Sequence, residues 1–442
     1  MQNAIRHFGP LALAAAAFLA TDLAAADQIR LDVAVSNPVM LSGSSQRAYV
    51  KVGLTGFPLI GTGSRTPTNV SIVLDRSGSM SGEKIRKAKE AALLAIDRLG
   101  PDDIVSVVAY NHTVEVLVPA TKVRDREQIY QKIESLHASG DTALFAGVSK
   151  GAREVLKFIE RHRVNRIILV SDGLANVGPS SPGDLGDLGW SLAKQGISVT
   201  TIGLGDGYNE DLMVALAGQS DGNHAFAENA ADLTRIFTYE FGDVLSVIAR
   251  ELTVRVECAP GVRPIRVLGR RAEINGRQIV TTLNQLYADQ EKFVLLEVEV
   301  PSQSSGSRLE IATVDVRYAN TVSKTTDVLG SRAVVSFSSS FAAVEAGQNK
   351  GVLVASVELL ANEANKNAVS LRDQGRVHEA EAALEANAAF LEKEADRYKS
   401  DELRGHAASN RKAKMKLAPS EWNKQRKVMA DDAFQLDNQQ AW

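Results

Sequence analysis

The spacing of hydrophobic residues changes along the chain, and each change predicts a different kind of structure. Residues 27–66 alternate apolar and polar positions, which is the pattern of half-buried β-strands. Between residues 68 and 242, short apolar runs alternate with segments whose apolar residues recur every three or four positions. Such runs are typical of strands buried on both faces of a parallel sheet, and the segments between them predict helices that cover those faces. We therefore expect an α/β domain with a doubly wound, mostly parallel sheet over residues 68–242.

One pair of strands in this domain must depart from the parallel arrangement. The segments Ile104–Ala109 and Val114–Val118 are joined by only a tight turn. A crossover between parallel neighbours needs a dozen or more residues, so these two strands are predicted to form an antiparallel hairpin at an edge of the sheet.

Strands without intervening helices return after residue 250. Clusters of Gly, Pro, Asn and Ser separate the predicted segments, which are Leu252–Glu257, Ile265–Leu268, Lys292–Val300, Leu309–Tyr318 and Ala333–Phe337. This pattern favours an antiparallel β-sandwich over residues 250–340. Because so few strands make a thin sandwich, we hypothesise that residues 27–66 belong to the same β-domain and that the α/β domain is inserted into it.

Residues 341–442 are predicted to be helical. The expected helices are Ala342–Ala364, Ala368–Gln374 and Val377–Tyr398. Gly375 marks a break that resembles the turn of a tetratricopeptide unit, but a single hairpin is no repeat array. Between Arg397 and Lys427, ten Lys or Arg residues stand against three Asp or Glu residues. This basic tail could contact an acidic surface, although a solvated charged face is the commoner reason for such a composition.

The first residues are typical of an export signal. A short basic stretch precedes an apolar run of about eleven residues, and Ala24-Ala25-Ala26 provides an A-x-A cleavage site before Asp27. That run is shorter than the roughly 20 residues that cross a bilayer, and no later run is long enough. No cysteine follows the signal to accept a lipid. We expect residues 1–26 to be a signal peptide and the remaining chain to be exported, to a periplasm or out of the cell.

Composition narrows the classes of partner. Of the 442 residues, 44% are hydrophobic and 23% are charged, and the net charge of −3 argues against binding to nucleic acid. The only cysteine, Cys258, cannot form an intramolecular disulfide, and we expect it to be a small apolar side chain in a strand.

Polar side chains gather where the first strand of the α/β domain ends. Asp75, Ser77 and Ser79 follow the apolar run Val70–Leu74 and precede a predicted helix. In open α/β sheets, ligands bind at this edge, where the strands have their carboxyl ends. A carboxylate and two hydroxyls in a tight loop are the hard oxygen ligands that Mg²⁺ prefers.

Two further oxygen ligands are predicted at the same edge. Thr142 precedes the helix predicted at Ala143–Ile159, and Asp172 follows the strand predicted at Arg166–Val170. Together, Asp-x-Ser-x-Ser, a loop with Thr, and Ser-Asp-Gly after a strand resemble the metal-ion-dependent adhesion site of von Willebrand factor A domains. The resemblance covers about residues 68–242. The order of parts resembles exported bacterial proteins labelled von Willebrand factor A or Ca²⁺-activated chloride channel-like and, more distantly, the heavy chains of inter-alpha-trypsin inhibitor.

The resemblance implies a role for each residue. It implies that Ser77 and Ser79 bind the metal directly, that Thr142 binds it directly or through water, and that Asp75 and Asp172 hold waters or the ion. The implied ion is Mg²⁺, with Mn²⁺ or Ca²⁺ as alternatives. One coordination position stays open for an Asp or Glu carboxylate of a protein partner. In the family the last helix of the domain, here Ala231–Phe241, can shift when the ligand binds.

Other interpretations of these residues are open at this point. The aspartate and serines of the first loop could cap the following helix without a metal, although capping explains neither Thr142 nor Asp172. Ser149 lies in a Gly-x-Ser-x-Gly pattern, but within a predicted helix, and nothing assembles a base and an oxyanion hole, so we expect no catalysis. The predicted function is divalent-cation-dependent protein–protein interaction outside the cytoplasm. The alternative is assembly or activation of an envelope enzyme or metal-handling complex.

Overall fold

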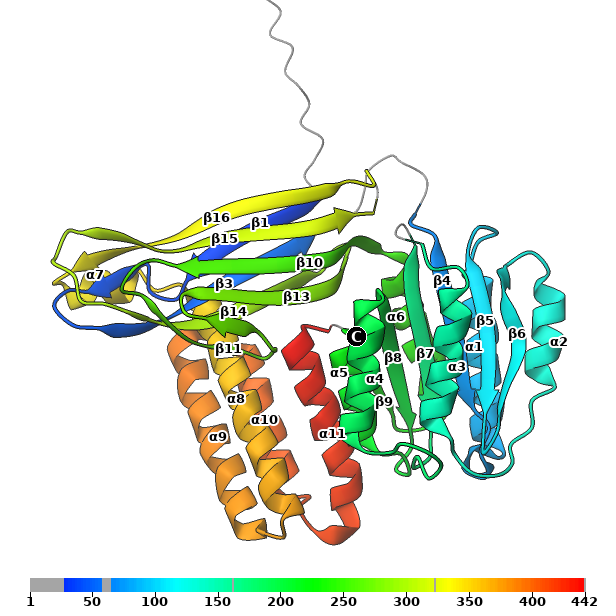
Figure 1. Ribbon diagram of the computed structural model, residues 1–442. Helices are drawn as coiled ribbons and strands as arrows, with labels where there is room; N and C mark the ends of the chain where they lie inside the picture. The colour runs from blue at the N-terminus through cyan, green and yellow to red at the C-terminus, as the bar shows by residue number, and fades with distance from the viewer. Residues whose placement is uncertain (1–27, 58–64, 161–162, 322, 441–442) are drawn as a thin grey trace, which may run out of the picture.

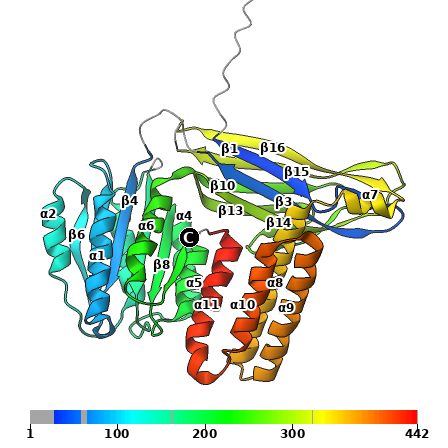
Figure 2. The same ribbon diagram turned by 180° about the vertical axis from the view of Figure 1, so that it is seen from behind.

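The computed structural model describes residues 28–57, 65–160, 163–321 and 323–440 (Figure 1). The predicted signal peptide, residues 1–26, lies outside the described residues. A β-domain lies across the top of Figure 1, and the α/β domain and a group of helices lie side by side below it, as the reverse view in Figure 2 also shows. Within the described part of the chain, no helix is both long and apolar enough to cross a membrane.

The α/β domain is built on a six-stranded sheet in the order β6-β5-β4-β7-β8-β9. Its strands are β4 (Thr68–Asp75), β5 (Ile104–Tyr110), β6 (Val114–Lys122), β7 (Val164–Ser171), β8 (Ile197–Leu204) and β9 (His224–Ala227). All neighbours are parallel except β5 and β6, which form the antiparallel edge hairpin that the sequence predicts. β4, β5, β7 and β8 are buried at every position, which explains why most of their residues are apolar and do not alternate with polar ones.

Helices cover both faces of this sheet, so the predicted doubly wound α/β fold is confirmed. Those on one face are α1 (Glu83–Asp97), α2 (Arg126–Glu134) and α6 (Asp232–Leu245), and those on the other are α3 (Leu144–Leu156), α4 (Pro182–Lys194) and α5 (Glu210–Gln219). In α1, the residues Ile85, Ala88, Ala92 and Ile96 recur at three- or four-residue spacing and are all buried. The helix therefore presents one apolar stripe to the sheet.

The β-domain is a sandwich of two sheets, in the orders β1-β3-β14-β11 and β12-β13-β10-β15-β16-β2. Its strands are β1 (Ile29–Val35), β2 (Val39–Leu41), β3 (Gln46–Gly56), β10 (Val247–Cys258), β11 (Arg263–Leu268), β12 (Glu273–Asn275), β13 (Gln278–Tyr287), β14 (Glu291–Val300), β15 (Arg308–Asn320) and β16 (Thr326–Ser338). β3 pairs antiparallel with β14, so segments from before and after the α/β domain share one sheet. The apolar core between the sheets includes Cys258, at the end of β10.

Two strands of the larger sheet, β12 and β13, were not predicted from the sequence. β13 lies between β12 and β10, and polar residues occupy two of its buried positions, Thr281 and Gln285. Gln285 accepts a hydrogen bond of 2.6 Å from Arg166 of the α/β domain. A polar residue with a buried partner interrupts the apolar alternation by which strands are recognised.

The C-terminal part consists of α7 (Phe341–Ala346), α8 (Lys350–Asp373), α9 (Val377–Tyr398), α10 (Asp401–Lys414) and α11 (Pro419–Asn438). The predicted break between Ala364 and Ala368 is wrong, because α8 is continuous there. The break lies before α8 instead, where the Asn349 side chain accepts a hydrogen bond from the backbone N–H of Val352 and caps the helix. α8 and α9 form a hairpin at Gly375, whose φ of +79° suits glycine.

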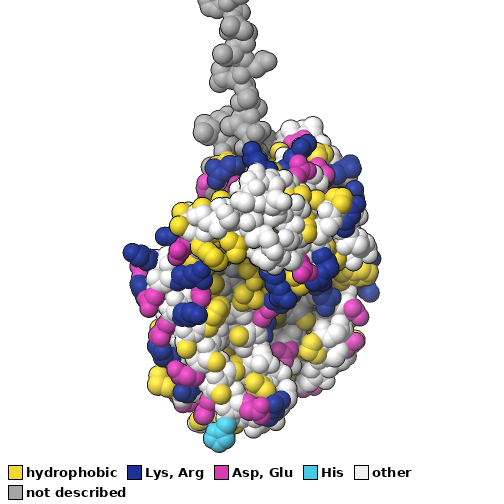
Figure 3. Space-filling model, turned by 90° about the vertical axis from the view of Figure 1, so that its left-hand side faces the viewer, with side chains coloured by type: hydrophobic (Ala, Val, Ile, Leu, Met, Phe, Trp, Pro, Cys, Tyr) yellow, Lys and Arg dark blue, Asp and Glu magenta, His cyan; other side chains and the backbone are white. Residues whose placement is uncertain are grey.

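Helix α11 joins these helices to the α/β domain. Arg426 binds Asp211 of α5 and Asp373 of α8, each at 2.8 Å. Lys427 is buried and lies 2.8 Å from Glu210 of α5. Most basic residues of the predicted tail are therefore paired within the chain, and part of the tail contacts an acidic surface of its own α/β domain. The face of the molecule in Figure 3 has both basic and acidic side chains.

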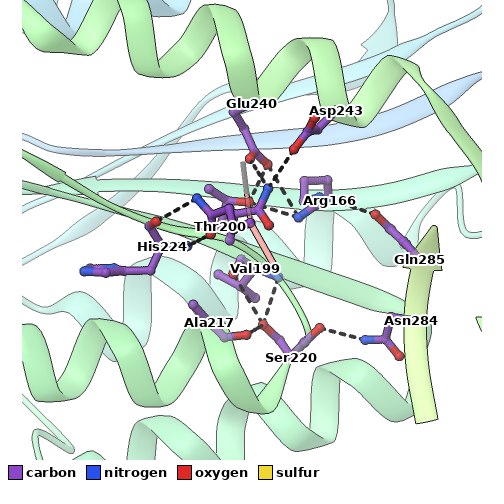
Figure 4. A network of polar contacts seen from close by, with 12 residues as sticks. Arg166, Val199, Thr200, Ala217, Ser220, His224, Glu240, Asp243, Asn284 and Gln285 are labelled. Carbon is purple, nitrogen blue, oxygen red and sulfur yellow. Dashed lines mark hydrogen bonds and ion pairs between the residues drawn. The ribbon is translucent and has the colours of Figure 1, made fainter. Parts of the chain in front are cut away.

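A buried polar network joins the α/β domain to the β-domain (Figure 4). Arg166, near the start of β7, donates hydrogen bonds of 2.6 Å to both Gln285 and Tyr287 of β13. It also donates a hydrogen bond of 3.0 Å to Thr200 of β8. Glu240 of α6 lies 3.5 Å from the guanidinium and accepts a hydrogen bond from Thr200. The network therefore ties α6, the last helix of the α/β domain, to the sheet and to β13.

Candidate metal site

The loops that follow β4 and β7 meet because the two strands are neighbours. Leu74 pairs with Val170 in the parallel register, so Asp75 lies beside Ser171. Oγ of Ser171 donates a hydrogen bond of 2.6 Å to Oδ2 of Asp75. The chain leaves β4 for β5 on one side and returns to β7 on the other. Open α/β sheets bind ligands beside such a switch point, at the carboxyl ends of the strands.

The loop between β4 and α1 turns its serine hydroxyls toward Asp172. The Oγ atoms of Ser77 and Ser79 lie 3.0 Å apart, and Ser79 donates a hydrogen bond of 2.7 Å to Oδ1 of Asp172. The backbone N–H of Ser77 donates a hydrogen bond of 2.8 Å to Oδ1 of Asp75. α1 begins after Gly82, whose φ is 77°, and no side chain caps it. Helix capping therefore does not explain the two serines.

The loop before α3 brings Thr142 to the same place. The backbone N–H of Gly78 donates a hydrogen bond of 2.9 Å to the carbonyl of Gly140, which ties this loop to the serine loop. A β-carbon at Gly173 would lie 2.9 Å from Oγ1 of Thr142 and 3.5 Å from Oγ of Ser79. Gly173 therefore leaves a space that the hydroxyls of Thr142 and Ser79 border.

Asp172 also has a charged neighbour that the sequence analysis missed. Its carboxylate is fully buried, and Oδ2 forms an ion pair with Nζ of Lys84 in the first turn of α1. A helix N-terminus carries partial positive charge, so a lysine in the first turn is electrostatically unfavourable on its own. This placement is the sequence signal that could have drawn attention to Lys84.

Asp75 is fully buried at the end of β4. Burial raises the pKa of its carboxyl, hydrogen bonds from Ser171 and Ser77 oppose the rise, and the charge of Asp172 adds to it. The hydroxyl of Tyr110, on β5, lies 3.4 Å from Oδ2 of Asp75. A cation beside this carboxylate would offset the free-energy cost of burying its charge.

The donor set fits a hard divalent cation. The structure brings together all five residues predicted from the sequence, which are Asp75, Ser77, Ser79, Thr142 and Asp172. Their side chains offer only oxygen, and Mg²⁺ usually keeps several waters, so a partial set of protein ligands suffices. Lys84 supplies one positive charge against two carboxylates, which leaves negative charge for an ion. Asp141, beside Thr142, is exposed to solvent.

Comparisons with known proteins agree with this fold. Residues 69–238 match the family model of the von Willebrand factor type A domain. An uncharacterized protein of Synechocystis is 31% identical over 275 residues, which make up 60% of this chain and 64% of that protein. Human inter-alpha-trypsin inhibitor heavy chain H3 is 28% identical over 170 residues, 36% of this chain and 19% of the relative. The chain thus spans less than two thirds of the length of either relative.

A solved structure resembles nearly the whole chain. The structure of a von Willebrand factor type A protein from Catenulispora acidiphila is 16% identical, with a TM-score of 0.72. The likeness covers 93% of this chain and 97% of that one, so it includes the β-domain and the C-terminal helices. Strand order, helix placement and the family match agree, and the chain therefore contains a von Willebrand factor type A domain.

Proposed function

We propose that the chain binds a protein partner outside the cytoplasm through a divalent cation, which is Mg²⁺ or else Mn²⁺ or Ca²⁺. Asp75, Ser77, Ser79, Thr142 and Asp172 hold the ion, and an Asp or Glu side chain of the partner completes its coordination. A carboxylate that replaces a bound water gains strong charge attraction with a fixed direction. The export signal expected at residues 1–26 gives the location.

One observation carries this proposal. Ser79, Thr142 and Asp172 come from three loops, yet Ser79 binds Asp172 at 2.7 Å and both hydroxyls border the space at Gly173. A buried cluster with only a structural role is expected to balance its charges. Among the residues that the structure describes, two buried carboxylates are paired with one ammonium, that of Lys84, so the cluster is suited to receive a cation.

Titration calorimetry of the mature chain with MgCl₂ tests the metal site. The wild type is expected to bind, and Asp172→Asn is expected to lose binding because an amide has no charge and is a weaker ligand. Asp141→Asn is the matched control, since Asp141 is an exposed carboxylate next to Thr142 and outside the donor set. Unchanged binding in Asp172→Asn, with the control also unchanged, would overturn the assignment of these residues.

Capture from an envelope extract tests the interaction itself. The wild type and Asp172→Asn are immobilised in parallel, each with Mg²⁺ and with EDTA. We expect a partner to be retained only by the wild type with Mg²⁺, and mutation of its exposed acidic residues to abolish retention. Retention of the same proteins under all four conditions would contradict a metal-dependent contact and would place the binding surface elsewhere on the chain.

A further inference from the structure

A cavity of about 390 Å³ lies among the C-terminal helices, away from the metal site. Residues of α8, α10 and α11 line it, together with Glu228, which follows β9. Figure 2 shows α10 and α11 beside one another in this part of the molecule. The volume is at the lower end of the roughly 300–1,000 Å³ that small-molecule sites have.

Asn410, on the wall of this cavity, has an unused hydrogen-bond donor. The residue is 3% exposed, and its Nδ2 has no hydrogen-bond partner among the described residues. The neighbouring buried amides differ: Nδ2 of Asn362 donates to the carbonyl of Ala433 at 2.9 Å, and Nδ2 of Asn387 donates to that of Ala361 at 2.8 Å. A buried amide without an acceptor is costly, so Asn410 indicates an acceptor that the protein itself does not supply.

The charges around the cavity favour an anion. Lys424 is neutralised by an ion pair with Glu228. Lys412 and Lys416 also line the cavity, and neither forms an ion pair with any residue that the structure describes. Asp432 supplies one negative charge to the lining, so these lysines leave an excess of positive charge.

The remaining lining indicates that the anion is organic. Val428, Met429 and Leu436 of α11 contribute apolar surface to the same cavity. A free inorganic ion would leave that surface against water, whereas a ligand with an apolar body would cover it. Gln425, 7% exposed, adds a further amide to the wall.

We propose that this cavity is a binding site for a small organic oxyanion, a carboxylate or a phosphate ester with an apolar body. Its oxygen accepts the hydrogen bond of Asn410, its charge lies near Lys412 and Lys416, and its apolar part contacts Met429 and Leu436. The cavity is separate from the loops that carry Asp75, Thr142 and Asp172. A test of the oxyanion site is therefore independent of a test of the proposed cation site.

Ligand-observed NMR on the full chain tests this site with benzoate, phenyl phosphate, inorganic phosphate and, as a neutral control, benzyl alcohol. We expect benzoate or phenyl phosphate to bind with a dissociation constant below about 10 mM, and the other two to bind more weakly. Preference for benzoate or phenyl phosphate identifies the oxyanion. If neither organic anion binds, or benzyl alcohol binds equally well, the proposal is wrong.

Variants locate the binding. Asn410→Leu and the double change Lys412→Met with Lys416→Met are each expected to weaken binding by about tenfold or more. The matched control is Lys393→Met, because Lys393 is an exposed lysine of α9 outside the cavity. Should Asn410→Leu fail to fold, the double lysine variant gives the same information, since Lys412 is exposed. Full binding in the lysine variant would place the anion elsewhere and overturn the proposal.

Discussion

Strand β7 has a buried charge at each end, and the protein surrounds the two charges differently. Arg166, near the start of the strand, donates hydrogen bonds to three side chains and faces Glu240, so its charge is balanced within the protein. Asp172 directly follows the last residue of the strand. It accepts a hydrogen bond from a serine and pairs with Lys84, but Asp75 adds a second buried carboxylate to the same site.

The difference separates a structural polar network from a site that can receive a ligand. Both ends are equally buried, so burial does not distinguish them. The charge of Arg166 is paired with Glu240, although its Nε has no hydrogen-bond partner among the described residues, and removal of either member of the pair would leave an uncompensated charge. Two carboxylates and converging hydroxyls against one lysine leave negative charge, which a bound cation would balance. Charge balance therefore distinguishes the two ends of β7.

The largest expected effect is on stability, and it comes from removing the charge of Arg166 near the start of β7. We expect Arg166→Met to lower the free energy of unfolding by about 3–5 kcal/mol, because Glu240 and the polar groups of β13 lose their buried partner. Chemical denaturation measures this loss. Arg332→Met is the control: its side chain is 70% exposed and lies 3.2 Å from Glu310, so the expected change is below about 1 kcal/mol. Similar losses of stability in Arg166→Met and Arg332→Met would show that the buried network contributes no more to stability than an exposed ion pair does.

A further carboxyl group, that of Asp243, lies near Arg166 and Glu240, together with the buried ammonium of Lys292, and it should make stability depend on pH. Burial and the charge of Glu240 raise the pKa of Asp243, on α6, to about 7. Between about pH 4 and 7 the folded state then binds more protons than the unfolded state. The stability that the protonated Asp243 contributes is therefore fully present below pH 4 and is lost as the pH rises through 7. Relative to Asp243→Asn, the wild type should lose about 2.5 kcal/mol between pH 5 and 8.

Denaturation of wild type and variant across this pH range tests that assignment. Asp187→Asn is the control, because Asp187 lies on an exposed part of α4 and should leave the slope unchanged. The difference between wild type and Asp243→Asn is the informative quantity, since other groups titrate in both proteins. A difference that stays constant with pH would show that Asp243 keeps an ordinary pKa in the folded protein.

At the other end of β7, where Asp75 and Asp172 lie near Lys84, we expect the removal of a charge to strengthen metal binding. We expect Lys84→Met to bind Mg²⁺ about tenfold more tightly, or 1.4 kcal/mol, because the ammonium that pairs with Asp172 competes with the ion. Titration calorimetry measures the change. Lys87→Met, on the same helix but paired with Glu90, should bind as the wild type does. Weaker binding in Lys84→Met would mean that the ammonium orders the site rather than competes for it.

The sequence allowed much of the α/β domain to be predicted, because strands buried on both faces leave continuous apolar runs. The run Val70–Leu74 is one example, and all of β4 is buried. Asp75 and Asp172 follow from the rule that carboxyl ends of parallel strands meet at one edge, and the complete set of five follows from the resemblance to the metal-ion-dependent adhesion site; the structure does bring them together. Their role as metal ligands stays a prediction.

The features that were missed depend on contacts distant in sequence. β13 was not predicted because the polar residue Gln285 occupies one of its buried positions. The hydrogen-bond partner of Gln285 is Arg166, which is 119 residues away in the sequence. α8 contacts α11 close to the break that was predicted, where Asn362 of α8 donates a hydrogen bond to the carbonyl of Ala433. The place of Lys84 in the first turn of a helix is unusual for a lysine, but only the fold shows that its partner is Asp172. The pattern of apolar residues predicts the helices and strands. The hydrogen bonds and ion pairs between polar groups of different elements become visible only in the structure.

The smallest expected effect is on Mg²⁺ affinity. It tests how close the hydroxyls of Thr142 and Ser79 lie to the ion. Gly173→Ala should weaken Mg²⁺ binding by about fivefold, near 1 kcal/mol, with little change in metal-free stability. The new methyl group would lie 2.9 Å from Oγ1 of Thr142, which is closer than side-chain atoms normally pack, so the Thr142 side chain must move. Gly183→Ala is the control, because its nearest neighbour would be 3.6 Å away. Wild-type affinity in Gly173→Ala would mean that Thr142 does not approach the ion closely, and the direct ligands would then come from the serine loop and the two aspartates.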